Sequence, residues 1–246
     1  MAENKILPSN RDVCIVDIPG DFYLTIACDS AGGIGEKRRD VVKVPASVVG
    51  RFTCRVALME TLAVGAAPKA VAAAVCCEPS PTGEKILAGI REELCEAGLD
   101  LPVVISTEKN ILTCQTGLGV TVTGIAKKSD LRVNRTRAGD RLYCVGMPRV
   151  GDEVKLNDSR IADTNLVRKL SQIPCIHDII PVGSKGIKGE AELLVSHLGL
   201  SLTWQDNVPL DIKKSAGPAT CVLVTSSEDL KLTCSQPVYL LGVIDV

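Results

Sequence analysis

An apolar run that leads into a glycine-rich stretch, with an acid before the glycines and a lysine after them, sets the first constraint on this chain. Residues 22–27 (FYLTIA) are apolar enough to form a buried strand that delivers Asp29 to its end. Three glycines and a lysine follow, namely Gly32, Gly33, Gly35 and Lys37. This pattern suits a phosphorylated ligand with its metal ion. The acid can hold the metal, the glycines let the backbone approach closely, and the lysine side chain can neutralise phosphate charge. The alternative is a glycine-rich turn with a solvated lysine.

Composition indicates a soluble globular protein and argues against nucleic acid as a partner. The 246 residues are 46% hydrophobic and 23% charged, with a net charge of -1. One Trp, three Tyr and two Phe offer little base stacking, and no basic run attracts a phosphate backbone. The longest apolar stretch, residues 57–77, is interrupted by Glu60, Pro68 and Lys69, so we expect no membrane span. The N-terminal segment has no apolar core, and nothing in it directs export.

The eleven cysteines are read as reduced thiols in the core. They form no C-x-x-C pair and no Cys/His spacing of the zinc kind. Most lie in hydrophobic runs, where a free thiol behaves as a small apolar side chain. We therefore expect a cytoplasmic protein, with a redox or metal role as the alternative.

Strand-like and helix-like segments are interleaved along the chain and predict an α/β (α+β) fold in two halves. Strands at 12–18 and 22–29 form a hairpin across a Pro-Gly-Asp turn, and residues 46–64 have the apolar spacing of a helix. The later expected elements are a strand at 71–77, a helix from 80 to 98, strands at 102–106, 112–127 and 141–148, a helix at 161–170, a strand at 176–183, a helix after 183, and strands at 219–226 and 237–246. A polar stretch, residues 130–140, separates the halves. We expect domains at 1–130 and 139–246.

Acids at the connections are candidate metal ligands. Asp12 and Asp29 lie at opposite sequence ends of the two hairpin strands, which antiparallel pairing brings together. Two close carboxylates repel unless a cation sits between them. Glu60 borders the apolar stripe of the 46–64 helix without a salt-bridge partner on that helix. The alternatives are strand-end acids in water for the two aspartates and a rim acid facing water for Glu60.

The motifs occur in an ordered series: Asp12, then Asp29 with GGIGEK, METLAVGAAP, STEKN, TGIA, GDRLYCVG and HDIIPVGSKGI. This series resembles the aminoimidazole ribonucleotide synthase (PurM-like) superfamily, which includes thiamine-monophosphate kinase, selenophosphate synthetase and the hydrogenase-maturation dehydratase. The resemblance covers nearly the whole chain. It implies a two-domain PurM-like ATP-binding fold, with an N-terminal sheet and helices and a smaller C-terminal α/β domain. It also implies a homodimer whose N-terminal sheets form a shared barrel, with nucleotide and Mg²⁺ at the interface.

The resemblance assigns roles to individual positions. The implied Mg²⁺ ligands are Asp12, Asp29, Glu60 and Glu108. The implied nucleotide-binding residues are Gly32, Gly33, Gly35, Lys37, Thr107 and Asn110, and the implied substrate-binding residues are Asp178 and Lys185. The chain departs from the family where Glu60 replaces Asp, Ala57 replaces Asn, 106–107 replace two glycines, and Lys185 lies in place of an acid. Lys185 suggests a negatively charged substrate or, alternatively, a solvated loop lysine.

Within the superfamily the motifs narrow the expected activity. No reactive cysteine lies in a glycine-rich N-terminal segment, no cysteine tail ends the chain, and the second half is short with an altered glycine motif. What remains is a compact chain whose motifs STEKN (106–110) and QTG (115–117) resemble those of the α-ribazole kinases, which phosphorylate a nucleoside-like cobamide precursor with ATP and Mg²⁺. Phosphoryl transfer needs positioning and charge neutralisation more than a strong base, so we assign no catalytic base. The alternatives are another ATP-dependent enzyme of the superfamily or a non-catalytic nucleotide-binding protein.

Overall fold

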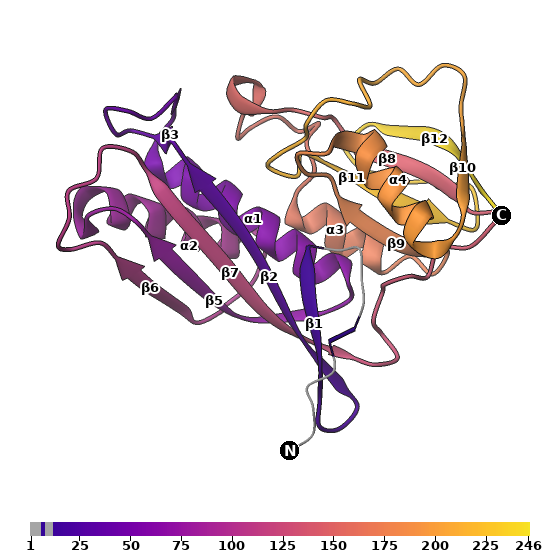
Figure 1. Ribbon diagram of the computed structural model, residues 1–246, viewed down its shortest axis with the longest axis horizontal. Coiled ribbons are helices and arrows are strands. Elements are labelled where there is room, and N and C mark those ends of the chain that lie inside the picture. The colour runs from indigo at the N-terminus through magenta and orange to yellow at the C-terminus, as the bar shows by residue number, and fades with distance from the viewer. Residues whose placement is uncertain (1–5, 8–11) are drawn as a thin grey trace. The chain divides into compact units, whose positions relative to one another are not determined.

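Two five-stranded sheets, one in each half of the chain, organise this computed structural model, which describes residues 6–7 and 12–246 (Figure 1). One compact unit is built mainly from residues 12–61 and 67–127, and the other mainly from 62–66 and 128–246. The α/β expectation is confirmed in both units. No helix among the described residues is both long enough and apolar enough to cross a membrane.

The first unit carries one mixed sheet and two long helices. Its elements are β1 (Val13–Ile18), β2 (Phe22–Gly32), β3 (Ile34–Gly35), β4 (Val42–Lys43), α1 (Ala46–Ala63), β5 (Ala67–Val75), a single turn (Pro79–Gly83), α2 (Glu84–Glu96), β6 (Val103–Thr107) and β7 (Gly117–Lys127). The sheet order is β1-β2-β7-β5-β6, with β5 and β6 parallel and every other neighbouring pair antiparallel. The predicted hairpin is present as β1 and β2, with Val13 opposite Ala27.

Strand β2 is longer than the sequence pattern predicts. It runs on to Gly32, which pairs with Gly117 at the start of β7, so Asp29 lies within the strand opposite Val120. The expectation that Asp29 ends the strand is therefore wrong. The reason is that β7 supplies backbone hydrogen-bond partners along the whole of β2, and these keep the glycine-rich end extended.

Helices α1 and α2 cover one face of the first sheet (Figure 1). The buried side chains on that face include Val71 and Val75 of β5 and Val120 of β7. The opposite face carries exposed and mostly small side chains, among them Cys14, Cys28, Ala72, Ala74 and Val104. The expectation that the cysteines lie in the core is therefore wrong for Cys14 and Cys28, because every second side chain of these strands points to this face. This face, on which neither α1 nor α2 packs, is referred to below as the open sheet face.

The contact between α1 and α2 combines close backbone approach with a buried ion pair. A Cβ atom on Gly50 would overlap the carbonyl oxygen of Ile86, so the two helix backbones approach each other more closely than any residue other than glycine would allow here. Beside this contact, Arg55 donates from Nε and Nη2 to the two carboxylate oxygens of Glu93, each over 2.8 Å. The side chains of Arg55 and Glu93 are only 4% and 2% exposed. This bidentate pair joins the middle of α1 to the last turn of α2.

The second unit has an antiparallel sheet with helices against it. Its elements are β8 (Arg141–Gly146), a short 3₁₀ turn (Gly151–Glu153), α3 (Thr164–Ser171), β9 (Ile176–Pro181), α4 (Gly186–Leu198), β10 (Ser201–Trp204), β11 (Cys221–Ser226) and β12 (Val238–Asp245), and the sheet order is β10-β12-β8-β11-β9. Asp163 caps α3 by accepting from the N–H of Leu166 at 2.7 Å, which explains why this helix begins later than predicted. Strand β10 was not predicted, because four residues are too few to show a clear alternation of apolar and polar side chains.

Candidate functional site

Strands β1 and β2 bring two of the predicted metal ligands into electrostatic contact. Asp12 directly precedes β1 and is exposed, whereas Asp29 lies partly buried on β2. Burial raises the pKa of Asp29 to about 6 from its ordinary 3.8, a hydrogen bond with the backbone of Ser30 lowers it in part, and the charge of Asp12 raises it further. The two carboxylates supply oxygen ligands of the kind that Mg²⁺ prefers, and a bound divalent cation would relieve the repulsion between them. The pair therefore fits Mg²⁺ in chemistry.

The other two predicted ligands do not join this pair in a metal cluster. Glu108 follows β6, which is separated from β2 by β7 and β5, a distance of about 14 Å across the sheet. Its Oε1 accepts from the N–H groups of Asn110 and Ile111, and these bonds lower its pKa. Glu60 lies near the end of α1 and is 8% exposed, so it is a buried acid and not a rim acid. Across the described ranges, no three His, Cys, Asp or Glu residues form a group that could hold a metal ion.

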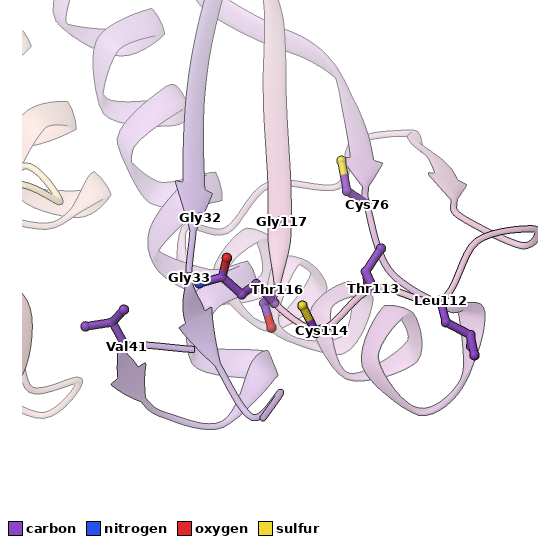
Figure 2. Close-up of a pocket in the computed structure, with 10 residues that line it drawn as sticks. Gly32, Gly33, Val41, Cys76, Leu112, Thr113, Cys114, Thr116 and Gly117 are labelled. Carbon is purple, nitrogen blue, oxygen red and sulfur yellow. The ribbon is translucent and has the colours of Figure 1, made fainter. Parts of the chain in front are cut away.

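A pocket of about 580 Å³ opens where β2 ends and β7 begins (Figure 2). Its lining residues are Gly32, Gly33, Val41, Cys76, Leu112, Thr113, Cys114, Gln115, Thr116 and Gly117. Three of these are glycines, which leave the backbone open to close approach, and none carries a charge. Of the predicted nucleotide-binding residues, Gly32 and Gly33 line this pocket, whereas Thr107 and Asn110 are not among its lining residues.

The segment after the pocket glycines is held in place by a buried acid that the sequence reading missed. Asp40 accepts from both the N–H and the hydroxyl of Thr116, each at 2.7 Å, and from the N–H of Lys37 at 2.8 Å. Burial opposes ionisation of Asp40, but these hydrogen bonds outweigh it and lower its pKa. Gly35, at φ +147°, packs so closely that a Cβ atom there would lie 2.5 Å from Thr116 Oγ1. The segment that follows the pocket glycines is thus tied to Thr116 at the start of β7.

Lys37 points its ammonium into the protein and not into open solvent. Its Nζ donates to Glu78 Oε2 at 2.5 Å and to the carbonyl oxygen of Thr113 at 3.1 Å, and its side chain is 14% exposed. Glu78 lies between β5 and α2 and was not a predicted site residue. Only its position two residues before a plausible helix start could have indicated Glu78, and many surface acids share that position.

The predicted substrate residues lie in the second unit and differ in exposure. Asp178 is 1% exposed, and its Oδ2 accepts from the N–H groups of Arg135 and Thr136 and from the Thr136 hydroxyl at 2.6 Å. These contacts hold the chain segment that precedes β8. Lys185 is half exposed, and its Nζ lies 3.9 Å from Glu190 Oε1. Asp178 thus has internal partners, whereas Lys185 is open to an anion or to water.

No protein-family model and no curated protein sequence matches the chain, but solved structures do. Thiamine-monophosphate kinase from Stenotrophomonas maltophilia K279a matches with a TM-score of 0.66 and 15% identity, over 99% of this chain and 90% of that one. AaThiL complexed with AMPPCP and TMP matches with a TM-score of 0.69 and 13% identity, over 99% of this chain and 86% of that one. PurLQS from Thermotoga maritima matches with a TM-score of 0.65 and 18% identity, over 98% of this chain. This chain spans only 38% of the length of that last protein. At these identities the likeness concerns the fold alone, and the chain shares the two-domain PurM-like fold of these proteins.

Proposed function

We propose that the protein is an ATP- and Mg²⁺-dependent small-molecule kinase, and more narrowly an α-ribazole kinase that phosphorylates the ribose hydroxyl of a cobamide precursor. The observation that carries the proposal is the partly buried carboxylate of Asp29 on β2, because burial, and to a lesser extent the charge of Asp12, makes it costly to ionise in the absence of a cation. The similar fold of AaThiL, a protein solved with AMPPCP, supports an ATP-binding role. The narrower substrate assignment rests on the sequence motifs STEKN and QTG.

Each residue of the site has a distinct role in this proposal. Asp12 and Asp29 hold Mg²⁺, which when bound neutralises charge on the ATP phosphates. Gly32 and Gly33 let the backbone approach the nucleotide closely. Because a single chain does not gather all four predicted acids, Glu108 would reach the pair only from a second copy of the chain. Lys185 remains the proposed contact for a charged substrate group.

The second copy is proposed to cover the open sheet face. Its exposed residues include Cys14, Cys28, Ala72, Ala74 and Val104, whose small side chains leave the sheet accessible to another backbone layer. Light scattering after gel filtration is expected to give twice the 26.0 kDa mass of the chain. Val104→Arg should shift the protein toward the monomer, because a charge would be buried in the interface. A wild-type protein that stays monomeric while it binds Mg-ATP would contradict this arrangement.

The proposed activity is tested in two steps. Calorimetry should detect ATP binding that is present with Mg²⁺ and lost on addition of a chelator. Incubation with labelled Mg-ATP and a panel of α-ribazole, thiamine phosphate and formylglycinamidine ribonucleotide should then yield phosphorylated α-ribazole. A transient acyl- or imidate-phosphate would indicate a different enzyme of this fold, and binding without turnover would indicate a nucleotide sensor. If the wild-type protein does not bind ATP in the presence of Mg²⁺, the proposed function is refuted.

A further inference from the structure

The pocket at the ends of β2 and β7 needs a cation from outside its own lining if it is to hold a polyphosphate. Its ten lining residues are uncharged. The ammonium of Lys37 lies against one of them, because it donates to the carbonyl oxygen of Thr113 at 3.1 Å. Figure 2 places Thr113 on the segment that leads through Cys114 and Thr116 into β7. Lys37 is therefore a charged group next to the wall of this pocket, behind Thr113, although it is not itself one of the lining residues.

Glu78 fixes the position of that ammonium. One carboxylate oxygen, Oε2, lies 2.5 Å from Lys37 Nζ, and the other, Oε1, accepts from the hydroxyl of Thr82. Thr82 is 7% exposed, so it anchors the carboxylate from a buried position. Burial opposes ionisation of Glu78, but the bonds from Lys37 and Thr82 outweigh it and lower its pKa. The carboxylate of Glu78 therefore stays ionised at neutral pH.

The hydrogen-bonding capacity of Lys37 is not exhausted by these contacts. An ammonium has three N–H donors, and Glu78 and Thr113 accept two of them. A lysine side chain that is free in solution loses considerable rotamer freedom when it meets a ligand, and an anchored one has lost that freedom already. In protein kinases an ion pair between a lysine and a glutamate similarly has to be in place before phosphoryl transfer.

We propose that Glu78 is a positioning residue, which holds Lys37 at the wall of the pocket so that its third N–H meets a phosphate oxygen of bound ATP. This inference rests on the proposed function, because it requires that ATP binds in this pocket. It predicts that Glu78 affects the binding of ligands that carry phosphates and not the binding of the nucleoside alone. Loss of Glu78 should weaken binding of ATP and leave binding of adenosine nearly unchanged, because adenosine has no phosphate for Lys37 to contact.

The test compares ATP and adenosine dissociation constants, in Mg²⁺, for wild type and for variants of the full chain. Glu78→Gln is expected to weaken ATP binding about tenfold, the effect of one misplaced charge-assisted hydrogen bond, and adenosine binding less than about twofold. Glu84→Gln is the matched control, because Glu84 is exposed, lies six residues away, and its carboxylate accepts a hydrogen bond from the hydroxyl of Ser80. It should change neither constant.

A double-mutant cycle distinguishes a Glu78 that positions Lys37 for ATP from a Glu78 that only stabilises the fold. Lys37→Met combined with Glu78→Gln should bind ATP no more weakly than Lys37→Met alone, because Glu78 then has nothing to position. Thr82→Val, which keeps the ion pair and removes its anchor, should weaken ATP binding about threefold and serves if Glu78→Gln does not fold. Equal weakening of ATP and adenosine, or additive effects in the double variant, would overturn the positioning role. If wild type binds ATP and Glu78→Gln binds it equally well, this inference alone is overturned. If wild type does not bind ATP, the proposed function is overturned as well.

Discussion

Asp29→Asn is expected to abolish Mg-dependent ATP turnover and, in the absence of metal, to raise the melting temperature of the protein at pH 8. The activity should fall at least about a hundredfold, since even residues that only orient metal ligands cost 10–100-fold when replaced. The stability should rise because Asn carries no charge to be repelled by Asp12 or to be desolvated on β2. Opposite effects on activity and stability are the mark of an acid kept for function.

The pH dependence of this effect has a definite sign. The pKa of Asp29 is raised to about 6 in the folded protein from an ordinary 3.8. The stabilising contribution of the protonated group is therefore fully present below about pH 4 and is lost as the pH rises through 6. The Asn variant should match or fall below wild type at pH 4 and exceed it at pH 8. Thermal melts at the two pH values, with and without Mg²⁺, measure the difference.

Mg²⁺ and a neighbouring acid provide the controls. Mg²⁺ should raise the melting temperature of wild type at pH 8 and should not raise that of Asp29→Asn, because a ligand stabilises only the form that binds it. Asp21→Asn, in the exposed turn of the same hairpin, should behave as wild type in every measurement. Near-normal turnover by Asp29→Asn, or an equal response of both proteins to Mg²⁺, would refute the metal assignment.

Glu93→Gln is expected to lower the free energy of unfolding by about 3–5 kcal/mol, because it leaves the guanidinium of Arg55 buried without its countercharge. Arg55 is 3% exposed, is bound through two 2.8 Å hydrogen bonds to Glu93, and lies 4.9 Å from the ring centroid of Phe52. The Gln amide can accept from only one of the two donors. Urea unfolding measures the loss.

The same helix supplies the control for this prediction. Glu96 pairs with Arg51, but its side chain is 53% exposed, so Glu96→Gln should cost less than about 1 kcal/mol. Replacing both buried partners, as in Arg55→Met with Glu93→Leu, should recover most of the stability lost in Glu93→Gln, because neither charge is then desolvated. Similar losses for the Glu93 and Glu96 variants would show that the buried pair contributes no more than a surface one.

Local features of the sequence predict the fold well. The hairpin of β1 and β2 follows from two apolar runs around a Pro-Gly-Asp turn, and α1 follows from the apolar spacing of residues 46–64. The proximity of Asp12 and Asp29 follows from that hairpin, because adjacent antiparallel strands fix which residues meet. Each of these predictions needs only neighbouring segments of the chain.

The parts that the sequence reading missed depend on contacts between distant segments. The separation of Glu108 from Asp29 arises because β7 and β5 lie between β2 and β6, an order that no local pattern specifies. Glu78 is 41 residues from Lys37, and Thr116 is 76 residues from Asp40. A glycine pattern indicates an open backbone, but it does not indicate which distant side chain packs against it.

The hydrogen bonds of Asp40 to Thr116 also limit what can be transplanted from this protein. Closing 76 residues of chain is an entropic cost that the complete sheet of the first unit has to offset. Grafting the GGIGEK segment into a foreign scaffold would transfer the glycines without the buried acid, the threonine and the strand that shape the cavity. A recombinant fragment intended to retain ligand binding should therefore extend through β7.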